Sequence, residues 1–290
     1  MEWDPTQFFR EDDARSLHPF ALLVLNQPIN ETALAVLRKY ALMTVCADGG
    51  ANRFFEWAKS RGEESVDLPT TIIGDLDSIR PEVRSHYTNL GVNVIQDDDQ
   101  YSTDFTKSLQ YIREHKRDTL PSSETGEYQR LSILILGGLG GRVDQAFSQI
   151  HHLYEVNQSE SQGNGKGNLY LISEESITFI LQPGDNIIHV PRTNRLSHQH
   201  PEPNPNPEST KQETEDGKYL LEENVGIIPL LGAARISTSG FEWDVQDWKT
   251  EIGGQISTSN HIRAETVQVQ TGVPVLFTLE LARRLKRVSR

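Results

Sequence analysis

Short apolar runs alternate with amphipathic stretches between Phe20 and Val156, and this order constrains the fold more than any other feature of the chain. The apolar runs are Phe20–Leu25, Thr44–Ala47, Thr70–Ile73, Val92–Ile95 and Leu131–Leu136. The last run shows no polar alternation, as expected of a strand that is covered on both faces. Strands that alternate with helices predict an N-terminal α/β domain with a mostly parallel sheet.

The stretches between these runs carry helix signals. Asn30 suits the N-cap of a helix whose apolar residues recur at helical spacing. Pro81 favours the first turn of a second helix, and Gly91 is typical of its C-terminal end. Phe105 and Leu109 lie four residues apart in a third helix.

The pattern changes after Asn168 to short strand-like pieces separated by turn residues, which predicts an antiparallel β-sandwich. We therefore expect three parts along the chain: an N-terminal extension at 1–19, the α/β domain at 20–160, and the sandwich at 168–282.

One stretch of the second half differs from its surroundings. Arg192–Asp216 contains a ladder of prolines followed by an acidic, Ser/Thr-rich segment. Too few apolar residues are present to offset the conformational entropy of the chain. We therefore predict a disordered insertion within the sandwich, at 192–218.

Charge and composition exclude several classes of partner. The chain has 28 Lys+Arg and 41 Asp+Glu, a formal net charge of −13, which repels nucleic acids and anionic membranes unless a local basic patch intervenes. A single cysteine, Cys46, cannot form an internal disulfide. No leader peptide and no run of 18 apolar residues is visible in the sequence. We expect a soluble cytoplasmic protein with no nucleic-acid or membrane partner.

Aspartates follow four of the predicted strands, at the point where each strand ends. They are Asp48, the pair Asp75 and Asp77, the run Asp97–Asp99, and Asp144. Ligands of an open α/β sheet bind outside the carboxyl ends of its strands. Two carboxylates about 4 Å apart repel by about 4 kcal/mol at an effective dielectric constant near 20, and a bound cation removes that cost. Oxygen ligands without clustered Cys or His favour Mg²⁺.

The spacing of Asp75 and Asp77 places both on one side of an extended segment, about 6.5 Å apart, so both could flank one ion. Asp104 opens a helix at the same sheet edge and is a candidate third ligand, with Lys107 three residues on to meet a phosphate. Each feature also has a plain structural explanation, because aspartates are common in turns and in the first turn of helices.

A glycine-rich turn, Gly137–Gly141, joins a buried strand to a helix. Glycines expose backbone amides, and a helix N-terminus favours an anion. The spacing matches neither the P-loop nor the dinucleotide fingerprint. Arg142 and Asp144 follow directly, which indicates phosphate contact and hydrogen bonding to a ligand.

Five motifs together resemble the thiamine pyrophosphokinase family, eukaryotic branch, and occur in the order seen there. They are Ala47–Arg53, Gly74–Glu82, Thr103–Lys107, Gly137–Gln145 and Ser257–Asn260. The resemblance implies an α/β domain that binds ATP and Mg²⁺, followed by a β-sandwich that binds thiamine. It also implies a homodimer with active sites at the subunit interface. The implied reaction moves the pyrophosphoryl group of ATP onto the hydroxyethyl oxygen of thiamine, which gives thiamine diphosphate and AMP.

The same resemblance implies roles for individual residues. The implied Mg²⁺ ligands are Asp48, Asp75, Asp77 and Asp104. The implied contacts to phosphates, to ATP or to the attacking hydroxyl are Lys107, Arg142, Asp144 and Gln145, and the implied lining of the binding site adds Gly49, Asn52 and Gly138. The implied thiamine site consists of Trp243, which would stack on the ligand, and of Ser257, Ser259 and Asn260.

Two other function classes compete with this interpretation. A Mg²⁺-dependent nucleotide-sugar glycosyltransferase would explain Asp75 and Asp77, but not Trp243 or the segment Ser257–Asn260. A non-catalytic sensor of thiamine or nucleotide would keep the fold without turnover. Without the resemblance, core packing explains Trp243 equally well, and a plain turn is the better explanation of Ser257–Asn260.

Overall fold

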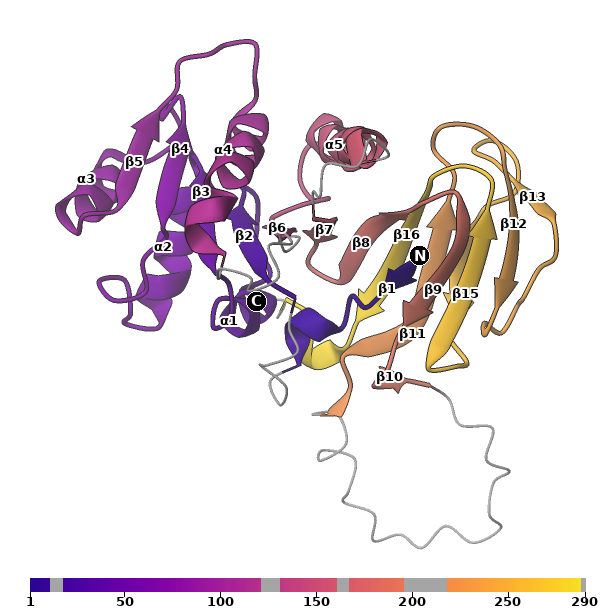
Figure 1. The fold of residues 1–290 in the computed structure, drawn as a ribbon. Helices are drawn as coiled ribbons and strands as arrows, with labels where there is room; N and C mark the ends of the chain where they lie inside the picture. The colour runs from indigo at the N-terminus through magenta and orange to yellow at the C-terminus, as the bar shows by residue number, and fades with distance from the viewer. Residues whose placement is uncertain (11–17, 121–130, 161–166, 196–217, 288–290) are drawn as a thin grey trace, which may run out of the picture. The chain divides into compact units, whose positions relative to one another are not determined.

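The computed structural model describes residues 1–10, 18–120, 131–160, 167–195 and 218–287. The described chain divides into two compact units. Residues 18–174 form the first, and residues 1–10 together with 175–287 form the second (Figure 1). Within the described residues, no helix combines the length and the apolar character needed to cross a membrane.

A sheet of six parallel strands forms the centre of the first unit. In spatial order the strands are β7 (Leu169–Ile172), β6 (Ser132–Leu136), β2 (Phe20–Val24), β3 (Met43–Ala47), β4 (Thr71–Gly74) and β5 (Asn93–Gln96). Every residue of β2, β3 and β6 is buried, as expected of strands with both faces covered. The predicted α/β fold class with a mostly parallel sheet is confirmed.

Five helices connect these strands in the part of the chain that the structure describes. They are α1 (Glu31–Leu37), α2 (Gly50–Ser60), α3 (Pro81–Asn89), α4 (Asp104–Thr119) and α5 (Val143–Glu160). The Asn30 side chain caps α1 by accepting from the amide of Ala33 at 3.0 Å. Pro81 occupies the first turn of α3, as predicted. Thr103 caps α4, because its side chain accepts from the Thr106 amide, and Asp104 lies in the first turn that follows.

The second unit is a β-sandwich with two sheets, most of whose strands are antiparallel (Figure 1). One sheet has the order β1 (Glu2–Trp3), β9 (Gly184–His189), β15 (Thr266–Thr271), β12 (Ala234–Ser239) and β13 (Trp248–Thr250). The other has the order β10 (Thr193–Asn194), β11 (Leu221–Ile228), β16 (Val275–Leu281) and β8 (Ser176–Leu181), with β14 (Ser257–His261) paired to β11. Exposed and buried residues alternate along β15, so one of its faces covers the core.

The first ten residues belong to the sandwich unit rather than to a separate extension. β1 pairs with β9 in parallel, and the buried Trp3 indole donates to Asn186 Oδ1 at 3.0 Å. The Trp3 ring also lies 5.0 Å from that of Phe179. A strand of two residues has no periodicity, so the sequence carried no sign of this pairing.

The division between the units also differs from the sequence-based position. The predicted sandwich at 168–282 includes Leu169–Ile172, yet as β7 this segment pairs in parallel with β6, and the units separate after Glu174. A short apolar run is compatible with a parallel or an antiparallel sheet, and the strand that it pairs with decides which sheet it joins. Most of the predicted insertion at 192–218 lies outside the described residues, which resume at Lys218.

Candidate functional site

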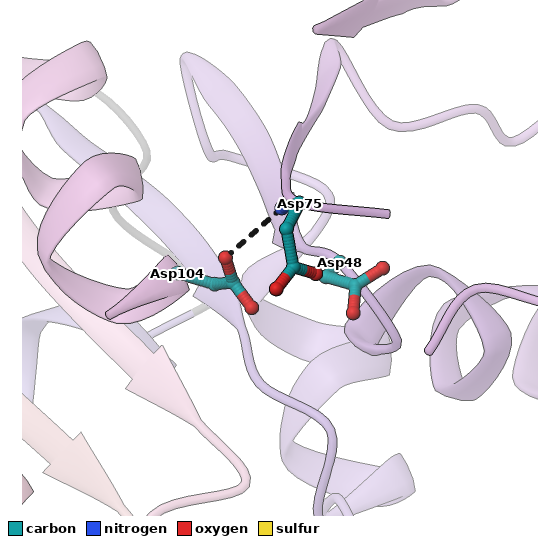
Figure 2. A group of neighbouring side chains, drawn as sticks. All are labelled: Asp48, Asp75 and Asp104. Atoms are coloured by element: carbon teal, nitrogen blue, oxygen red, sulfur yellow. Dashed lines mark hydrogen bonds between the residues drawn. The ribbon is translucent and has the colours of Figure 1, made fainter. Parts of the chain in front are cut away.

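Three aspartates from different segments meet at the carboxyl edge of the parallel sheet. Asp48, Asp75 and Asp104 each offer a carboxylate oxygen, and these oxygens lie within 4.8 Å of one another. Figure 2 shows the three side chains together, with the Asp75 amide donating to Asp104 Oδ1 at 3.2 Å. Hence three of the four predicted metal ligands form one cluster.

Backbone amides hold Asp48 in place. Asp48 follows β3 with a φ of +40°, a conformation that is uncommon outside glycine and that recurs at functional sites. Its two carboxylate oxygens accept from the amides of Ser78 and Ile79, both at 3.0 Å. The side chain is therefore fixed by the loop that follows β4, the same loop that carries Asp75.

Gly74, the last residue of β4, permits the cluster to form. A β-carbon at this position would lie 2.7 Å from Asp48 Cβ and 2.9 Å from Asp104 Oδ1. Any side chain would push these two aspartates apart, so the cluster depends on a glycine that sequence reasoning did not select. The sequence did carry one sign of this role, because Gly74 directly precedes Asp75 at the end of a predicted strand.

The electrostatics of the cluster suit a cation. Burial raises the pKa of Asp48 and of Asp104, partly opposed by the amide hydrogen bonds to each carboxylate. The proximity of Asp104 raises the pKa of Asp48 further, and Asp75 does the same for Asp104. Burial and mutual repulsion are both relieved when a divalent cation binds between the carboxylates.

Asp77 does not join the cluster. Sequence reasoning assumed an extended segment, but Leu76 has a φ of +64° and its side chain is buried. The Asp77 amide donates back to Asp75 Oδ1 at 3.1 Å, which closes a turn. The exposed Asp77 carboxylate accepts from the hydroxyl of Ser78 at 2.8 Å. Its predicted place on the same side as Asp75 is therefore wrong.

Lys107 supplies a fixed positive charge beside the cluster. Only 3% of its side chain is exposed, and its Nζ lies 3.5 Å from Asp104 Oδ1. The same Nζ donates to the carbonyl oxygen of Asp97 at 2.6 Å. A buried ammonium held in this way is a preorganised partner for an anion.

A cleft of about 390 Å³ surrounds the cluster. The predicted residues that line it are Asp48, Gly49, Asp75, Asp104, Lys107, Arg142 and Gln145. Further lining residues that sequence reasoning did not select include Asn26, Gln27, Gln100, Ser102, Ser148 and Gln149. Most of these are neutral polar residues in loops or on α5, and such residues have no distinctive pattern.

Of the residues predicted for ATP and the metal, four lie outside the lining of this cleft within the described chain: Asn52, Asp77, Gly138 and Asp144. Asn52 stabilises the loop after β4, because its side chain donates to the Ser78 carbonyl at 2.9 Å and accepts from the Arg80 amide at 3.0 Å. Asp144 binds Arg142 through two contacts of 2.5 and 3.1 Å. Both side chains are largely exposed.

A smaller pocket of about 200 Å³ lies within the sandwich unit. Its predicted lining residues are Trp243, Ser257 and Asn260, whereas Ser259 is not among the lining residues of the described chain. Ser259 has a φ of +54° and is exposed. The other lining residues are Ile236, Thr238, Val245, Trp248, Ile256 and Thr258. Two tryptophans therefore share this pocket, although sequence reasoning selected only one.

Asn260 holds Trp243 against this pocket. Its Oδ1 accepts from the Trp243 amide at 3.2 Å, and its Nδ2 donates to the Trp243 carbonyl at 3.0 Å. Trp243 remains 56% exposed, and the centroid of its ring lies 5.0 Å from that of His261. An indole that is half exposed is not packed in the core, and its free face is open to solvent.

Models of two protein families match the chain. "Thiamin pyrophosphokinase, catalytic domain" matches residues 34–162, and "Thiamin pyrophosphokinase, vitamin B1 binding domain" matches residues 210–276. The first match contains the aspartate cluster, and the second contains the tryptophan pocket. A relative from Oryza sativa subsp. japonica, "Thiamine pyrophosphokinase 1", is 32% identical over 93% of this chain and 89% of its own length.

Solved structures resemble the fold over almost the whole chain. "Thiamin pyrophosphokinase from Candida albicans" superimposes with a TM-score of 0.74 at 27% identity, covering 97% of this chain and 92% of the other. Yeast thiamin pyrophosphokinase superimposes with a TM-score of 0.76 at 24% identity, covering 97% and 90% of the two chains.

Proposed function

The chain belongs to the thiamine pyrophosphokinase family, and we propose that it transfers the pyrophosphoryl group of ATP to the hydroxyethyl oxygen of thiamine. The products are thiamine diphosphate and AMP. The observation that supports this most is the cluster of Asp48, Asp75 and Asp104 beside the buried Lys107. Pyrophosphoryl transfer needs positioning and charge neutralisation rather than a covalent nucleophile.

The donor set of the cluster fits Mg²⁺. Asp48, Asp75 and Asp104 offer hard oxygen ligands, and no Cys or His belongs to the group. A bound Mg²⁺ would neutralise the charge on the phosphates and on the leaving group. Asp77 stays in the proposed site, but as a residue near the ion rather than in the cluster.

In this proposal two cationic side chains, Lys107 and Arg142, bind the phosphates of ATP. Lys107 offers a charge that is already in place, since Asp97 and Asp104 hold its ammonium. Arg142 lies at the rim of the cleft and exchanges its contact with Asp144 for a phosphate oxygen. The hydrogen bond from Arg142 lowers the pKa of Asp144, so Asp144 orients Arg142 and is a poor general base.

The sandwich pocket is the proposed thiamine site. The face of Trp243 suits a cationic thiazolium ring, while Ser257 and Asn260 offer polar atoms at the pocket wall. Ser259 does not line this pocket, so its proposed contribution to thiamine binding is indirect, through the adjacent lining residues Thr258 and Asn260. ATP would bind at the cleft of the other unit, with Gly49, Asn52, Gly138 and Gln145 shaping or lining its site.

An assay of AMP release tests the reaction. We expect AMP to form from ATP only when thiamine is present, in amounts equal to thiamine diphosphate. AMP release without thiamine would indicate another transferase, such as the glycosyltransferase alternative. Thiamine binding without any turnover would indicate a sensor.

We further propose a cytoplasmic homodimer whose active sites lie at the subunit interface. Mixed dimers test this assembly. If each active site draws on both subunits, co-expression of Asp75→Asn and Trp243→Ala chains should restore about a quarter of the turnover, because about half of the dimers are mixed and each mixed dimer has one site with two intact halves. Absence of any recovery, with dimers confirmed by light scattering, would contradict shared sites.

A further inference from the structure

His152 is a buried polar residue to which the proposed reaction assigns no role. It lies on α5 and is 9% exposed. Both ring nitrogens have partners, since Nε2 lies 3.3 Å from Thr106 Oγ1 and Nδ1 lies 3.0 Å from Glu155 Oε2. The His152 ring also makes an edge contact with Phe105, with centroids 4.9 Å apart. His152 therefore joins α5 to the first turn of α4.

The contacts of His152 continue to the cleft as a chain of hydrogen bonds. Thr103 Oγ1 accepts from the Thr106 amide at 3.2 Å and lies 3.0 Å from Thr106 Oγ1. In the tautomer whose proton is on Nδ1, Nδ1–H donates to Glu155 and Nε2 accepts from the Thr106 hydroxyl. The Thr103 hydroxyl then donates to Thr106, so every proton in the chain has an acceptor.

This chain of hydrogen bonds ends at Thr103, the N-cap of α4, which directly precedes Asp104, the one member of the aspartate cluster that lies on α4. Thr103 lines the cleft, and Asp104 and Lys107 follow it in the first turn of the helix. Asp104 must lie close enough to Asp48 and Asp75 for one ion to bind all three. Its carboxylate is held by the Asp75 amide at 3.2 Å and by Lys107. The orientation of this turn therefore decides the spacing of the three carboxylates.

A second buried residue of α5, Gln149, holds the glycine-rich turn at another wall of the cleft. Gln149 is 5% exposed, and its Oε1 accepts from the Leu139 amide at 2.8 Å within the glycine-rich turn. One face of α5 thus holds both the glycine-rich turn, through Gln149, and the first turn of α4, through His152.

We propose that His152 is a positioning residue for the metal cluster, acting through Thr106 and Thr103 on Asp104. The inference rests on the proposed function only in taking the cluster as the ion site. Loss of outer partners of metal ligands costs about 10- to 100-fold in metal affinity or activity. Because His152 acts through two hydroxyls, we expect the lower end of this range.

The test measures binding of Mn²⁺, a paramagnetic substitute for Mg²⁺, by electron paramagnetic resonance without thiamine or turnover. His152→Phe keeps an aromatic ring but removes both polar contacts, and Thr106→Val removes only the hydroxyl. Each should raise the Kd for Mn²⁺ about tenfold. Thr106→Ser keeps the hydroxyl and should bind Mn²⁺ as the unaltered chain does.

Two further measurements separate positioning from general stability. The double variant His152→Phe/Thr106→Val should be no weaker than the weaker single variant, because both changes interrupt the same chain. The KM for thiamine should stay unchanged in all variants, while the Mg²⁺ concentration for half-maximal turnover rises about tenfold only in variants that carry His152→Phe or Thr106→Val. Thr88→Val is the matched control, since the Thr88 hydroxyl donates to a carbonyl of its own helix, Arg84 O, at 2.8 Å.

Native Mn²⁺ affinity in Thr106→Val would overturn the proposal, even if His152→Phe failed to fold. Additive losses in the double variant would overturn it as well, because the two residues would then act independently. A failure of the proposed function is distinguishable, since it would appear as absent thiamine-dependent AMP release in the unaltered chain while the Mn²⁺ comparison remained valid.

Discussion

Gly74 and Asp48 approach so closely that a β-carbon on Gly74 would lie 2.7 Å from Asp48 Cβ. The same β-carbon would lie 2.9 Å from a carboxylate oxygen of Asp104. Because Gly74 has no side chain, Asp48 and Asp104 can both pack against the end of β4 and so lie close to each other. A metal site at this edge requires glycine at the end of β4.

Gly74→Ala should accordingly separate the carboxylates. Overpacking of this kind costs about 1–3 kcal/mol in the free energy of unfolding, and displacement of catalytic groups by about 1 Å can lower the rate about 100-fold. Turnover and urea unfolding measure the two effects. Gly272→Ala is the control, because a β-carbon there meets nothing within 4 Å; equal losses in both variants would contradict the explanation.

Asp75 and Asp77 should differ in their contribution to ion binding. Asp75 belongs to the cluster, whereas the turn at Leu76 directs the Asp77 carboxylate to Ser78. We expect Asp75→Asn to abolish detectable Mg²⁺ binding in calorimetric titrations, and Asp77→Asn to weaken it less than tenfold. An equal loss in Asp77→Asn would restore Asp77 to the direct ligands that sequence reasoning assigned.

The stability of the ion-free protein should fall as pH rises through the raised pKa values of Asp48 and Asp104. Because burial raises both pKa values, the folded state binds these protons more tightly than the unfolded state does. Their contribution to stability is therefore fully present below the ordinary aspartate pKa and is lost as pH rises above it. Asp104→Asn, which keeps an oxygen for the Asp75 amide, should flatten this dependence in thermal unfolding from pH 4 to pH 7.

Magnesium should reverse that loss at neutral pH. An ion present at about 100 times its Kd adds about 2.7 kcal/mol to the free energy of unfolding. The gain should shrink in acid, because protons compete with Mg²⁺ for the same carboxylates. Thermal unfolding with and without Mg²⁺ measures it, and an equal gain in Asp104→Asn would argue against ion binding at the cluster.

Asn260 should control thiamine binding through Trp243. Asn260→Ala removes two hydrogen bonds to the Trp243 backbone, each worth about 0.5–1.5 kcal/mol. We expect the KM for thiamine to rise about tenfold with the KM for ATP unchanged. Asn260→Asp keeps the acceptor and should show a smaller rise. Asn93→Ala, at an exposed position in the other unit, should change neither constant.

Local patterns in the chain were sufficient to predict much of this protein. Alternating apolar runs indicated the parallel sheet, Thr103 and Asp104 marked the start of α4, and aspartates at strand ends indicated the sheet edge where Asp48, Asp75 and Asp104 meet. These features follow from residues a few positions apart, because strand and helix periodicity and capping are local properties.

Tertiary packing decided the remaining features. The left-handed turn at Leu76 separates Asp77 from Asp75, β7 joins the parallel sheet through β6, and β1 pairs with a strand more than 180 residues away. The contact of His152 with Thr106 likewise bridges 46 positions. Such contacts depend on which surfaces pack together, and no local pattern encodes the partner. The residue types that can bind Mg²⁺ are visible in the sequence, whereas their distances from one another arise only in the folded chain.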